Sequence, residues 1–387
     1  MQRLSAETRA ILLLCGHFGT TAADGKPLTP AEYHRFADWL AARQLSLGGL
    51  LGGGLSGALG EVRGINIAAA RLATLLGRQG DLERALDGWA RAGIWVLSLA
   101  DAEFPARLGA RLKSAVSPLV FGAGPRRRLG RGGVCIIGSR DSHEAGLEFA
   151  RRLGRRAGAA AMTVISSDMR GVDREAISST LAAGGNVVSV LSDSLVKAAA
   201  AKRNRDALAD GTMTLVTPFS PDTRFTVANA MRANKYQYAL SDVAVIVETR
   251  RKGGIWSGAE ENRAEGWVPA FVRSGDHMSP GNLALLHLGY QPIGLDDVET
   301  CDDLMAFFLA KREEAAAGVP TRAGRPDFYA AFIAELNAVA ASPVSAETIA
   351  EHFGIEAAQA RSWLARANQE GRVRKLGDPE RYVAGPA

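Results

Sequence analysis

Short apolar runs alternate with helical segments through the middle of the chain, and this alternation constrains the fold more than any other feature. The first apolar run is Val134–Ile137, and a segment of helical periodicity follows at His143–Ala157. Strands buried on both faces are apolar throughout, and parallel strands need a connection of about helix length. The pattern therefore predicts an α/β fold, a Rossmann-like doubly wound parallel sheet covered by helices. Its further segments lie at Met162–Ile165, Asp173–Ala183, Val187–Leu191, Thr214–Val216, Val243–Val247 and Val268–Val272.

The length of 387 residues suits two or three domains. Before the α/β pattern, the sequence has helical periodicity at Ser5–Leu14 and Pro30–Arg43, and a glycine-rich stretch typical of a loop at Gly48–Gly60. We therefore expect an N-terminal helical region at residues 1–80 and the Rossmann-like domain at residues 81–310.

The last part of the chain has a pattern typical of a winged helix. It follows a stretch rich in alanine, glycine and charge at Lys311–Gly324, which is typical of a linker. Three helices followed by a two-stranded hairpin predict a winged helix-turn-helix domain at residues 325–387. Its charges are nearly balanced, so duplex DNA binding and protein docking both stay open. The helices are expected at Asp327–Ala341, Ser345–Phe353 and Ala357–Glu370, and the hairpin at Arg372–Val383 with its turn at Gly377, Asp378 and Pro379.

Composition excludes several classes of protein. No apolar run approaches the roughly 20 residues that span a bilayer, so we expect a cytoplasmic protein without a membrane partner. The cysteines Cys15, Cys135 and Cys301 form no CxxC pair, and the histidines show no metal-binding spacing. We therefore expect neither a metal nor a cofactor. The net charge of +5 is compatible with binding to a polyanion but does not establish it.

Basic residues gather in three clusters of the predicted Rossmann-like domain. On a helix, a spacing of four places Arg151 with Arg155, and Arg152 with Arg156, on one stripe. The clusters can form a polyanion-binding surface, or they can be ordinary solvent-exposed helix faces, and the sequence leaves both interpretations open. The clusters are Arg126, Arg127, Arg128 and Arg131, then Arg151, Arg152, Arg155 and Arg156, and finally Lys202, Arg203 and Arg205.

Two turns between a strand and a helix carry candidate binding residues. The first, Gly138–Arg140, follows the first strand of the predicted sheet, and the second spans Ser166–Asp173. Ligands of open α/β sheets bind at the carboxyl ends of strands, where glycine lets the backbone approach and an arginine fork suits a phosphate. We expect both turns to converge on one crevice. Alternatively, Arg170 pairs with Asp173 and only orders its own loop.

Motifs in a fixed order over about residues 80–300 resemble the DNA-processing protein DprA (Smf) family. The two turns resemble its GSR and SGxARGID motifs, and later segments resemble its AL-x-x-GG, F-x-x-RNR…LS and VVEA…SG motifs. The resemblance implies a Rossmann-like domain that binds single-stranded DNA and mediates recombination in DNA processing and natural transformation. It further implies RecA as a partner, which the protein loads onto DNA, and a homodimer. The later matching residues are Leu181, Gly184, Gly185, Val190, Phe225, Arg232–Asp242, Val245–Glu248, Ser257–Ala259 and Pro280–Asn282.

The chain departs from the family's motifs at several positions. Ile177 stands in place of a histidine after the second turn, and Ser167 stands in place of a glycine. The RNR segment is replaced by Arg232–Lys235. These departures indicate a divergent branch of the family.

The segment Gly253–Glu260 supports a second hypothesis. It resembles the PGGxGTxxE loop of the LOG-type nucleoside-monophosphate phosphoribohydrolases, whose glutamate assists cleavage of an N-glycosidic bond. Here Trp256 replaces the motif's glycine and Lys252 its proline. An indole would crowd a phosphate cradle, but it can stack on a nucleobase or pack as a surface aromatic. The alternative function is therefore a nucleotide-binding or nucleotide-cleaving enzyme on the same fold. A third is an interaction module in signalling or defence.

We predict a protein that binds single-stranded DNA and catalyses no reaction. No catalytic residue is expected. The residues expected to bind DNA or its phosphates are Gly138, Ser139, Arg140, Ser166, Arg170, Gly171, Asp173, Arg232, Asn234, Lys235, Ser257 and Gly258.

Overall fold

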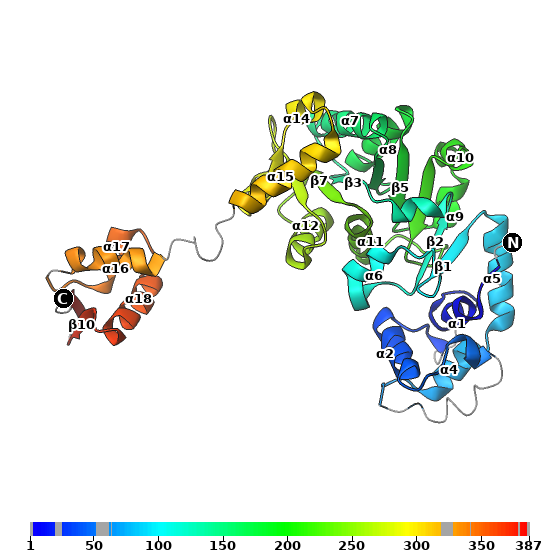
Figure 1. The fold of residues 1–387 in the computed structure, drawn as a ribbon, viewed down its shortest axis with the longest axis horizontal. Coiled ribbons are helices and arrows are strands. Elements are labelled where there is room, and N and C mark those ends of the chain that lie inside the picture. Colours follow the sequence, from blue (N-terminus) through cyan, green and yellow to red (C-terminus); the bar gives the residue numbers. More distant parts are fainter. Residues whose placement is uncertain are drawn as a thin grey trace. The chain divides into compact units, whose positions relative to one another are not determined.

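The structure is a computed structural model that describes residues 3–19, 25–51, 62, 64–318, 328–340, 342–377 and 380–384 (Figure 1). Contacts within the chain divide it into two compact units, Met1–Arg312 and Glu313–Ala387. Among the described residues, no helix combines the length and the apolar character that crossing a membrane requires.

A nine-stranded sheet forms the centre of the first unit. Its strands are β1 (Trp95–Ser98), β2 (Leu119–Ala123), β3 (Val134–Gly138), β4 (Thr163–Ser166), β5 (Asn186–Val190), β6 (Met213–Thr217), β7 (Val243–Glu248), β8 (Ala270–Arg273) and β9 (Gln291–Ile293). Their order is β1-β2-β6-β5-β4-β3-β7-β8-β9. The strands from β6 to β9 in this order pair in parallel, which confirms the predicted Rossmann-like α/β fold. The antiparallel pairs β1–β2 and β2–β6 are an addition that was not predicted.

Successive side chains of each strand enter two separate apolar layers. Val134 and Ile136 of β3 belong to one layer, and Cys135 and Ile137 belong to the other. Helices cover both faces, as Figure 1 shows, and this explains why the strands are apolar throughout. The first layer packs against α7 (Glu144–Ala159) and α8 (Val172–Ala182). The second packs against α6 (Ala106–Leu112), α11 (Val227–Leu240), α12 (Gly254–Glu265) and α13 (Pro280–His287).

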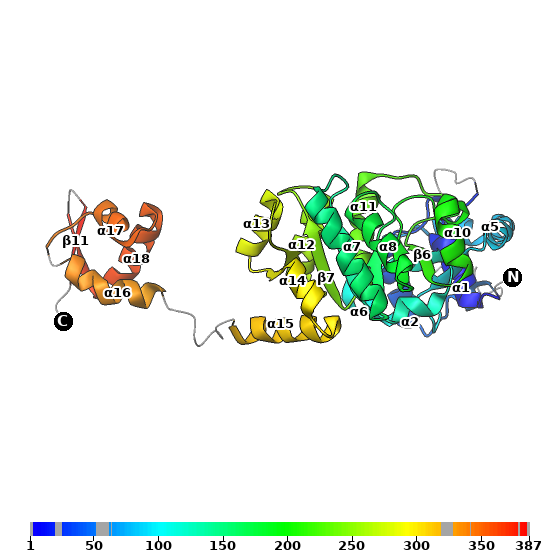
Figure 2. The same ribbon diagram turned by 90° about the horizontal axis from the view of Figure 1, so that it is seen from above.

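The N-terminal helices share the core of the sheet. They are α1 (Ala6–Cys15), α2 (Pro30–Ala41), the 3-10 turn η2 (Gly48–Leu51), α4 (Ala69–Leu76) and α5 (Gln79–Arg91). The middle of α1 is fully buried, and its residues belong to the same apolar cluster as β3 and α7. Thr8 of α1 also donates a hydrogen bond to Asp101 Oδ1 at 2.8 Å. Figure 2 shows α1 and α5 at the same end of the unit. The predicted loop residues 52–60 lie outside the described residues.

The remaining elements of the first unit are shorter, apart from one long helix. They are η3 (Lys113–Ala115), η4 (Arg126–Gly130), α9 (Leu195–Ala200), α10 (Lys202–Ala209), α14 (Leu295–Thr300) and α15 (Leu304–Gly318). The ring of Phe308 on α15 lies 5.0 Å from the ring of Phe271 on β8, so the helix is anchored on the sheet. The predicted linker was wrong in its first part, because α15 continues through Lys311 to Gly318. Residues 319–324 of that linker lie outside the described residues.

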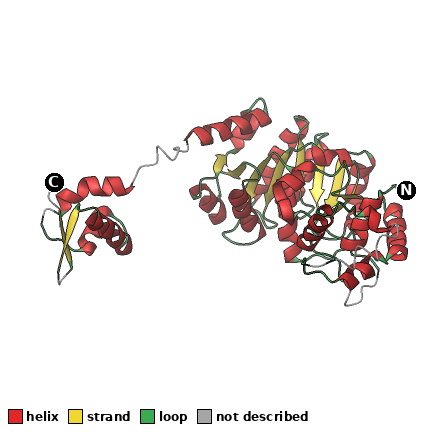
Figure 3. Ribbon diagram, turned by 60° about the horizontal axis from the view of Figure 1, so that its bottom comes forward, coloured by secondary structure: helices red, strands yellow, loops and turns green. Residues whose placement is uncertain are grey.

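Beyond the end of α15, the described residues of the second unit form three helices and a hairpin, which Figure 3 also shows. They are α16 (Phe328–Val339), α17 (Ala346–Phe353), α18 (Ala357–Gln369) and the antiparallel strands β10 (Val373–Leu376) and β11 (Arg381–Ala384). Ser345 caps α17, and Gly354 ends it in a left-handed conformation with φ 62°. Phe332, Leu336 and Leu364 contribute to a small core of its own. The winged-helix interpretation stays a prediction, and residues 378 and 379 of the predicted turn lie outside the described part.

Candidate functional site

A cavity opens where the order of the parallel strands reverses. The chain runs outward from β3 to β6 on one side and from β7 to β9 on the other, so β3 and β7 form the topological switch point. Ligands of such sheets bind at the carboxyl ends of the strands at this point. The cavity there measures about 370 Å³. It is lined by residues of the turns after β3, β4, β5 and β7, together with residues of α11 and the start of α12.

The turns after β3 and β4 are in direct contact. The Val172 N–H donates a hydrogen bond to the Ser139 carbonyl oxygen at 3.3 Å. Gly171, which begins α8, has φ 84°, and a Cβ at this residue would lie 2.4 Å from the Ser139 carbonyl oxygen. Only glycine fits both the backbone angle and the space. The approach places Ser139 and Arg140 on one wall of the cavity.

Asp173 is a buried carboxyl group that lines the same cavity. Its side chain accepts hydrogen bonds from the Gly138 N–H at 3.1 Å and from the Ser167 hydroxyl. Burial raises the pKa of Asp173 to about 7, although these donors and the nearby Arg140 guanidinium act to lower it. The charge of the cavity therefore changes near neutral pH.

The turn after β7 brings two cations to the cavity. Asn282 orders this turn, because its buried amide accepts from the Thr249 N–H at 2.9 Å and donates to the Val247 carbonyl at 2.9 Å. Arg250 and Lys252 follow on the exposed part of the turn and line the cavity. Neither makes an ion pair with a described residue. Their charges are therefore available to an anion.

Glu248 also lines the cavity, but its carboxylate is bonded to other groups of the protein. Its carboxylate is 5 % exposed and accepts hydrogen bonds from the Ser142 hydroxyl and from the His143 N–H at the start of α7. A carboxylate at a helix N-terminus is stabilised by the free N–H groups and by the helix dipole. Glu248 thus connects the turn after β3 with the end of β7.

Exposed apolar side chains line the cavity just before and within the first turns of α11. Phe225, Val227 and Met231 are exposed by 41 %, 69 % and 42 %, and all three line the cavity. The Arg140 guanidinium lies over the Phe225 ring, 4.9 Å from its centroid. An aromatic ring and further apolar side chains beside unpaired cations suit a ligand that has both flat bases and phosphates.

Two buried amide side chains of α11, those of Asn234 and Gln237, also line the cavity. Asn234 is 9 % exposed and donates from Nδ2 to the Gly254 carbonyl at 3.0 Å, which holds α11 against the start of α12. Gln237, one turn further along α11, donates from Nε2 to Asn234 Oδ1 at 3.2 Å.

The structure brings some of the predicted site residues together at this cavity and places others outside its lining. Ser166 is buried in β4 and donates to the Ile136 carbonyl at 2.6 Å. The Lys235 ammonium group pairs with Glu261. The residues that line the cavity are Gly138, Ser139, Arg140, Asp173 and Asn234. Those outside the lining are Ser166, Arg170, Gly171, Arg232, Lys235, Ser257 and Gly258.

Two of the arginines outside the lining have partners of their own. Arg170 pairs with Asp141 at 2.7 Å, so the alternative pairing with Asp173 was wrong. The Arg232 guanidinium lies 5.2 Å from the centroid of the Phe219 ring. Both side chains are exposed near the crevice, and their roles in binding stay predictions.

Sequence reasoning missed several lining residues. Gln237, Glu248 and Arg250 were not among the predicted binding residues, and Phe225 was noted only as part of a motif. A signal did exist for the turn after β7, because Arg250, Arg251 and Lys252 form a basic run directly after an apolar strand. Strand order was the missing information, since β7 lies far from β3 along the chain but beside it in the sheet.

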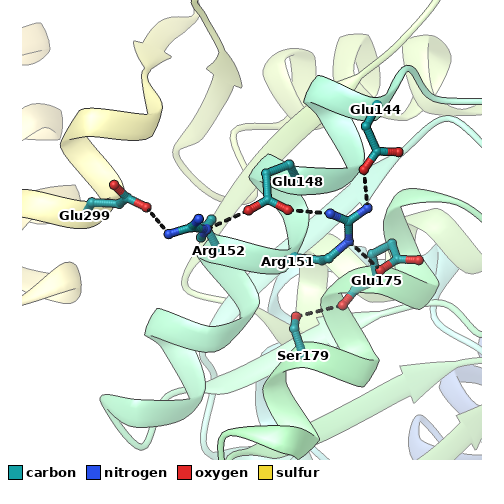
Figure 4. A network of polar contacts seen from close by, with 7 residues as sticks. All are labelled: Glu144, Glu148, Arg151, Arg152, Glu175, Ser179 and Glu299. Atoms are coloured by element: carbon teal, nitrogen blue, oxygen red, sulfur yellow. Dashed lines mark hydrogen bonds and ion pairs between the residues drawn. The ribbon is translucent and has the colours of Figure 1, made fainter.

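About half of the residues in the predicted basic clusters pair with carboxylates or carbonyl groups. Figure 4 shows that Arg151 on α7 contacts Glu144, Glu148 and Glu175. Arg152 joins the same network through Glu148 at 2.6 Å and Glu299 at 2.7 Å. In the other two clusters, members also have partners: Arg126 pairs with Glu103, Arg128 donates to the Gly211 carbonyl, and Arg203 pairs with Asp168. Ordinary ion pairs account for Arg126, Arg151, Arg152 and Arg203, whereas Arg127, Arg131, Arg155, Lys202 and Arg205 make no ion pair within the described ranges.

The segment that resembles a phosphoribohydrolase loop contributes only its beginning to the cavity. Gly253, which starts α12 with φ 101°, and Gly254 line it. Trp256 is half-buried and packs against the apolar layer under α12. Glu260 is exposed and does not belong to the lining. Within the described ranges, no three His, Cys, Asp or Glu side chains gather as metal ligands would.

Comparison with known proteins identifies relatives of both units. The family model of FaeA-like protein matches residues 330–378. Among solved structures, DNA processing protein A (DprA) from Streptococcus pneumoniae is similar with a TM-score of 0.55 and 17 % identity, over 76 % of this chain and 95 % of that one. DNA processing protein A from Helicobacter pylori, described with a single-stranded DNA binding mode, has 19 % identity and a TM-score of 0.46, over 58 % of this chain and 98 % of that one. No curated protein sequence matches.

The larger unit matches a family model of its own. DNA recombination-mediator protein A matches residues 95–298, a span that begins at β1 and passes β9. It contains the whole sheet and every turn that lines the cavity, and it covers more than half of the chain. The chain therefore belongs to the DNA recombination-mediator protein A (DprA) family.

Proposed function

We propose that the cavity at the switch point binds single-stranded DNA, and that the protein acts as a recombination mediator. The observation that carries the proposal is that cations without an ion pair and exposed apolar side chains line the same cavity. Arg140, Arg250 and Lys252 supply the cations, and Phe225 and Met231 supply apolar surface. Membership of the recombination-mediator family supports the same function.

The arrangement favours a single strand over a duplex. In a single strand the bases are free to turn toward Phe225 and Val227 while the phosphates contact Arg140 and Lys252. In a duplex the bases are stacked and paired, so an apolar wall at the cavity has nothing flat to contact. Phosphate contacts alone would bind both forms. The apolar wall is therefore the part that confers the preference.

Further properties of the family extend the proposal. The protein would protect single strands in the cytoplasm, pass them to RecA and act as a homodimer in natural transformation. The hairpin and helices at residues 325–387 would form a winged helix that docks on duplex DNA or on another protein. Support for these points comes from the family membership and from the motifs that the chain shares with that family.

A salt-titrated binding assay tests the central proposal. Fluorescence anisotropy would compare a single strand, the matching duplex and adenosine monophosphate. We expect the single strand to bind most tightly, with an affinity that falls as salt rises because phosphate contacts release counterions. Equal affinity for strand and duplex, or no dependence on salt, would contradict the proposal.

The same assay addresses the enzyme hypothesis. If adenosine monophosphate bound most tightly and chromatography detected free adenine, the protein would be a nucleotide-cleaving enzyme. Glu260 would then be the expected catalytic group, and Glu260→Gln would abolish release of the base. The position of Glu260 outside the cavity lining disfavours this outcome.

A further inference from the structure

The part of the chain around β2 concentrates basic side chains, several of them on η4 at the edge of the sheet opposite the cavity. Residues 103–131 contain seven arginines or lysines and one glutamate, so their net charge of +6 exceeds the +5 of the whole chain. Because η4 follows β2 and ends just before β3, it lies at the amino ends of the parallel strands. The cavity lies at their carboxyl ends, and β3, with five residues, spans about 16 Å between the two.

Two hydrogen bonds hold η4 and the residues after it at this edge. Arg128 donates from Nε to the Gly211 carbonyl oxygen at 3.0 Å, and Gly211 comes directly before β6. The Gly133 N–H, directly before β3, donates to Asp242 Oδ2 at 2.8 Å, and Asp242 directly precedes β7. Both bonds therefore attach the segment to the amino ends of neighbouring elements of the sheet.

Arg127, Arg128 and Arg131 form a group of like charges at this edge, the η4 cluster. Burial lowers the pKa of the Arg128 guanidinium group, and the neighbouring charges of Arg127 and Arg131 lower it further. Arg127 and Arg131 are exposed, and neither makes an ion pair with a described residue. Like charges held close together repel each other, so an anion that binds beside them is stabilised by all three.

The carboxylates around this edge do not compensate the η4 cluster. Glu103 pairs with Arg126 at 3.1 Å, and Asp242 pairs with Arg107 at 3.0 Å. Asp210, the residue that ends α10, is exposed and forms no ion pair with the cluster in the described structure. Guanidinium groups bind phosphate and carboxylate groups through paired hydrogen bonds. The edge therefore suits a ligand that carries several anionic groups.

We propose that the η4 cluster is a second phosphate-binding surface, which holds a distal part of the same single strand that enters the cavity. This inference rests on the proposed binding of single-stranded DNA. A strand too long for the cavity leaves it with uncompensated phosphates, and a positive surface on the same domain attracts them. Arginine contacts to phosphates carry no sequence information, so the cluster binds any sequence. A strand is favoured over an acidic protein segment because the cavity already brings it to this domain.

The test uses strand length to separate the two surfaces. Oligothymidine of about five nucleotides suits one site, whereas one of about thirty exceeds the roughly 4–16 nucleotides that common single-strand modules cover. In the full-length protein, Arg127→Ala combined with Arg131→Ala should leave binding of the short strand unchanged and weaken binding of the long strand. Loss of two phosphate contacts should make the slope of log affinity against log salt shallower by about 1.4 for the long strand. An excess of strand over protein keeps one copy of the protein on each strand. Arg128 is left in place because its bond to the Gly211 carbonyl holds η4.

Two further double variants serve as controls. Lys26→Ala combined with Arg35→Ala removes the same charge from exposed side chains before and within α2, which also lack an ion pair with any described residue. This variant should bind both strands as the wild-type protein does, and an equal loss for the long strand would assign the effect to net charge and overturn the inference. Arg127→Lys combined with Arg131→Lys keeps both charges and should retain the wild-type slope. Thermal unfolding shows that each variant is folded.

The outcomes separate this inference from the function on which it rests. If neither strand binds to the wild-type protein, the proposed function fails. If both strands bind, and the double alanine variant of the η4 cluster binds the long strand with wild-type affinity and slope, DNA binding stands and the second surface is refuted. Polyglutamate tests the protein alternative: if it binds to the wild-type protein but not to this variant, while the long strand binds equally to both, the surface takes an acidic protein segment and the inference is wrong.

Discussion

Two groups of arginine and lysine side chains in this protein look alike in the sequence but differ in the structure. On α7, Arg151 and Arg152 are enclosed by four glutamates in a network of ion pairs (Figure 4). Around the cavity, Arg140, Arg250 and Lys252 make no ion pair within the described ranges, although Asp173 and Glu248 lie nearby. Both carboxylates there are buried and hydrogen-bonded to hydroxyl and N–H donors.

On this comparison, the cations without carboxylate partners around the cavity are better candidates for an anion site than the cations in the network on α7. A guanidinium between carboxylates already has its charge compensated, and a phosphate would have to displace them. A cation without a partner gives up only water when it binds a phosphate. The following predictions test this contrast, from the largest expected effect to the smallest.

Arg140→Ala should weaken single-strand binding most, by about 1–3 kcal/mol, because the side chain offers charge-assisted hydrogen bonds and also holds the Phe225 ring. Arg152→Ala is the matched control and should leave the affinity nearly unchanged, since its charge is already paired. Anisotropy titrations at one salt concentration measure both. Similar losses of affinity in Arg140→Ala and Arg152→Ala would show that the paired and unpaired arginines do not differ in DNA binding.

Lowering the pH through about 7 should tighten single-strand binding, because Asp173 takes up a proton and the cavity loses a negative charge. Asp173→Asn imitates the neutral form and should be much less sensitive to pH in this range. Protonation of Asp173 also affects folding. In the unfolded chain this carboxyl group has its ordinary pKa of 3.8, whereas in the native state its pKa is about 7. The native state should therefore lose stability as the pH rises from about 4 to about 7. Binding titrations and thermal melts across this range measure both effects. An equally steep pH dependence of binding in Asp173→Asn would assign it to other groups.

Lys252→Ala should have a smaller effect on affinity but a distinct effect on its salt dependence. Each lost phosphate contact on a single strand makes the slope of log affinity against log salt shallower by about 0.7. Arg250→Ala should behave in the same way. An unchanged slope in both variants would show that the turn after β7 does not contact the strand.

Arg151→Ala should change stability and leave binding as it is. Its guanidinium contacts Glu144, Glu148 and Glu175, so its loss leaves three carboxylates close together and should lower the free energy of unfolding by about 1 kcal/mol. Chemical denaturation measures this change. A variant of full stability that bound DNA poorly would show that the network on α7 is an anion site after all.

Local signals in the sequence predicted the strands and several helix ends well. Ser345 and Gly354 mark the two ends of α17, and the continuous apolar runs mark the central strands of the sheet. The sequence did not reveal β9, which is short and contains Pro292, or α11, which is buried on several sides and therefore lacks a clear polar face.

The parts of the candidate site that the sequence predicted are those in which neighbouring residues form a recognisable motif. The turns after β3 and β4 each carry their own motif, so Arg140 and Asp173 were found. The turn after β7 joins them because of strand order, which no local pattern encodes. The sequence also does not show in which direction a side chain of α11 points. Lys235 pairs with Glu261, whereas Gln237, two residues later, lines the cavity.

The contact between Gly171 and the Ser139 carbonyl has a consequence for how tightly the site can bind. The Val172 N–H bonds to the Ser139 carbonyl oxygen at 3.3 Å, and Gly171 leaves no room for a Cβ beside it, so the two turns pack closely against each other. The wall that carries Ser139 and Arg140 is thus already formed before a ligand arrives, so the proposed complex would lose little chain entropy in forming it. The flexible strand must instead adapt to the protein, so the entropic cost of the complex falls mainly on the nucleic acid.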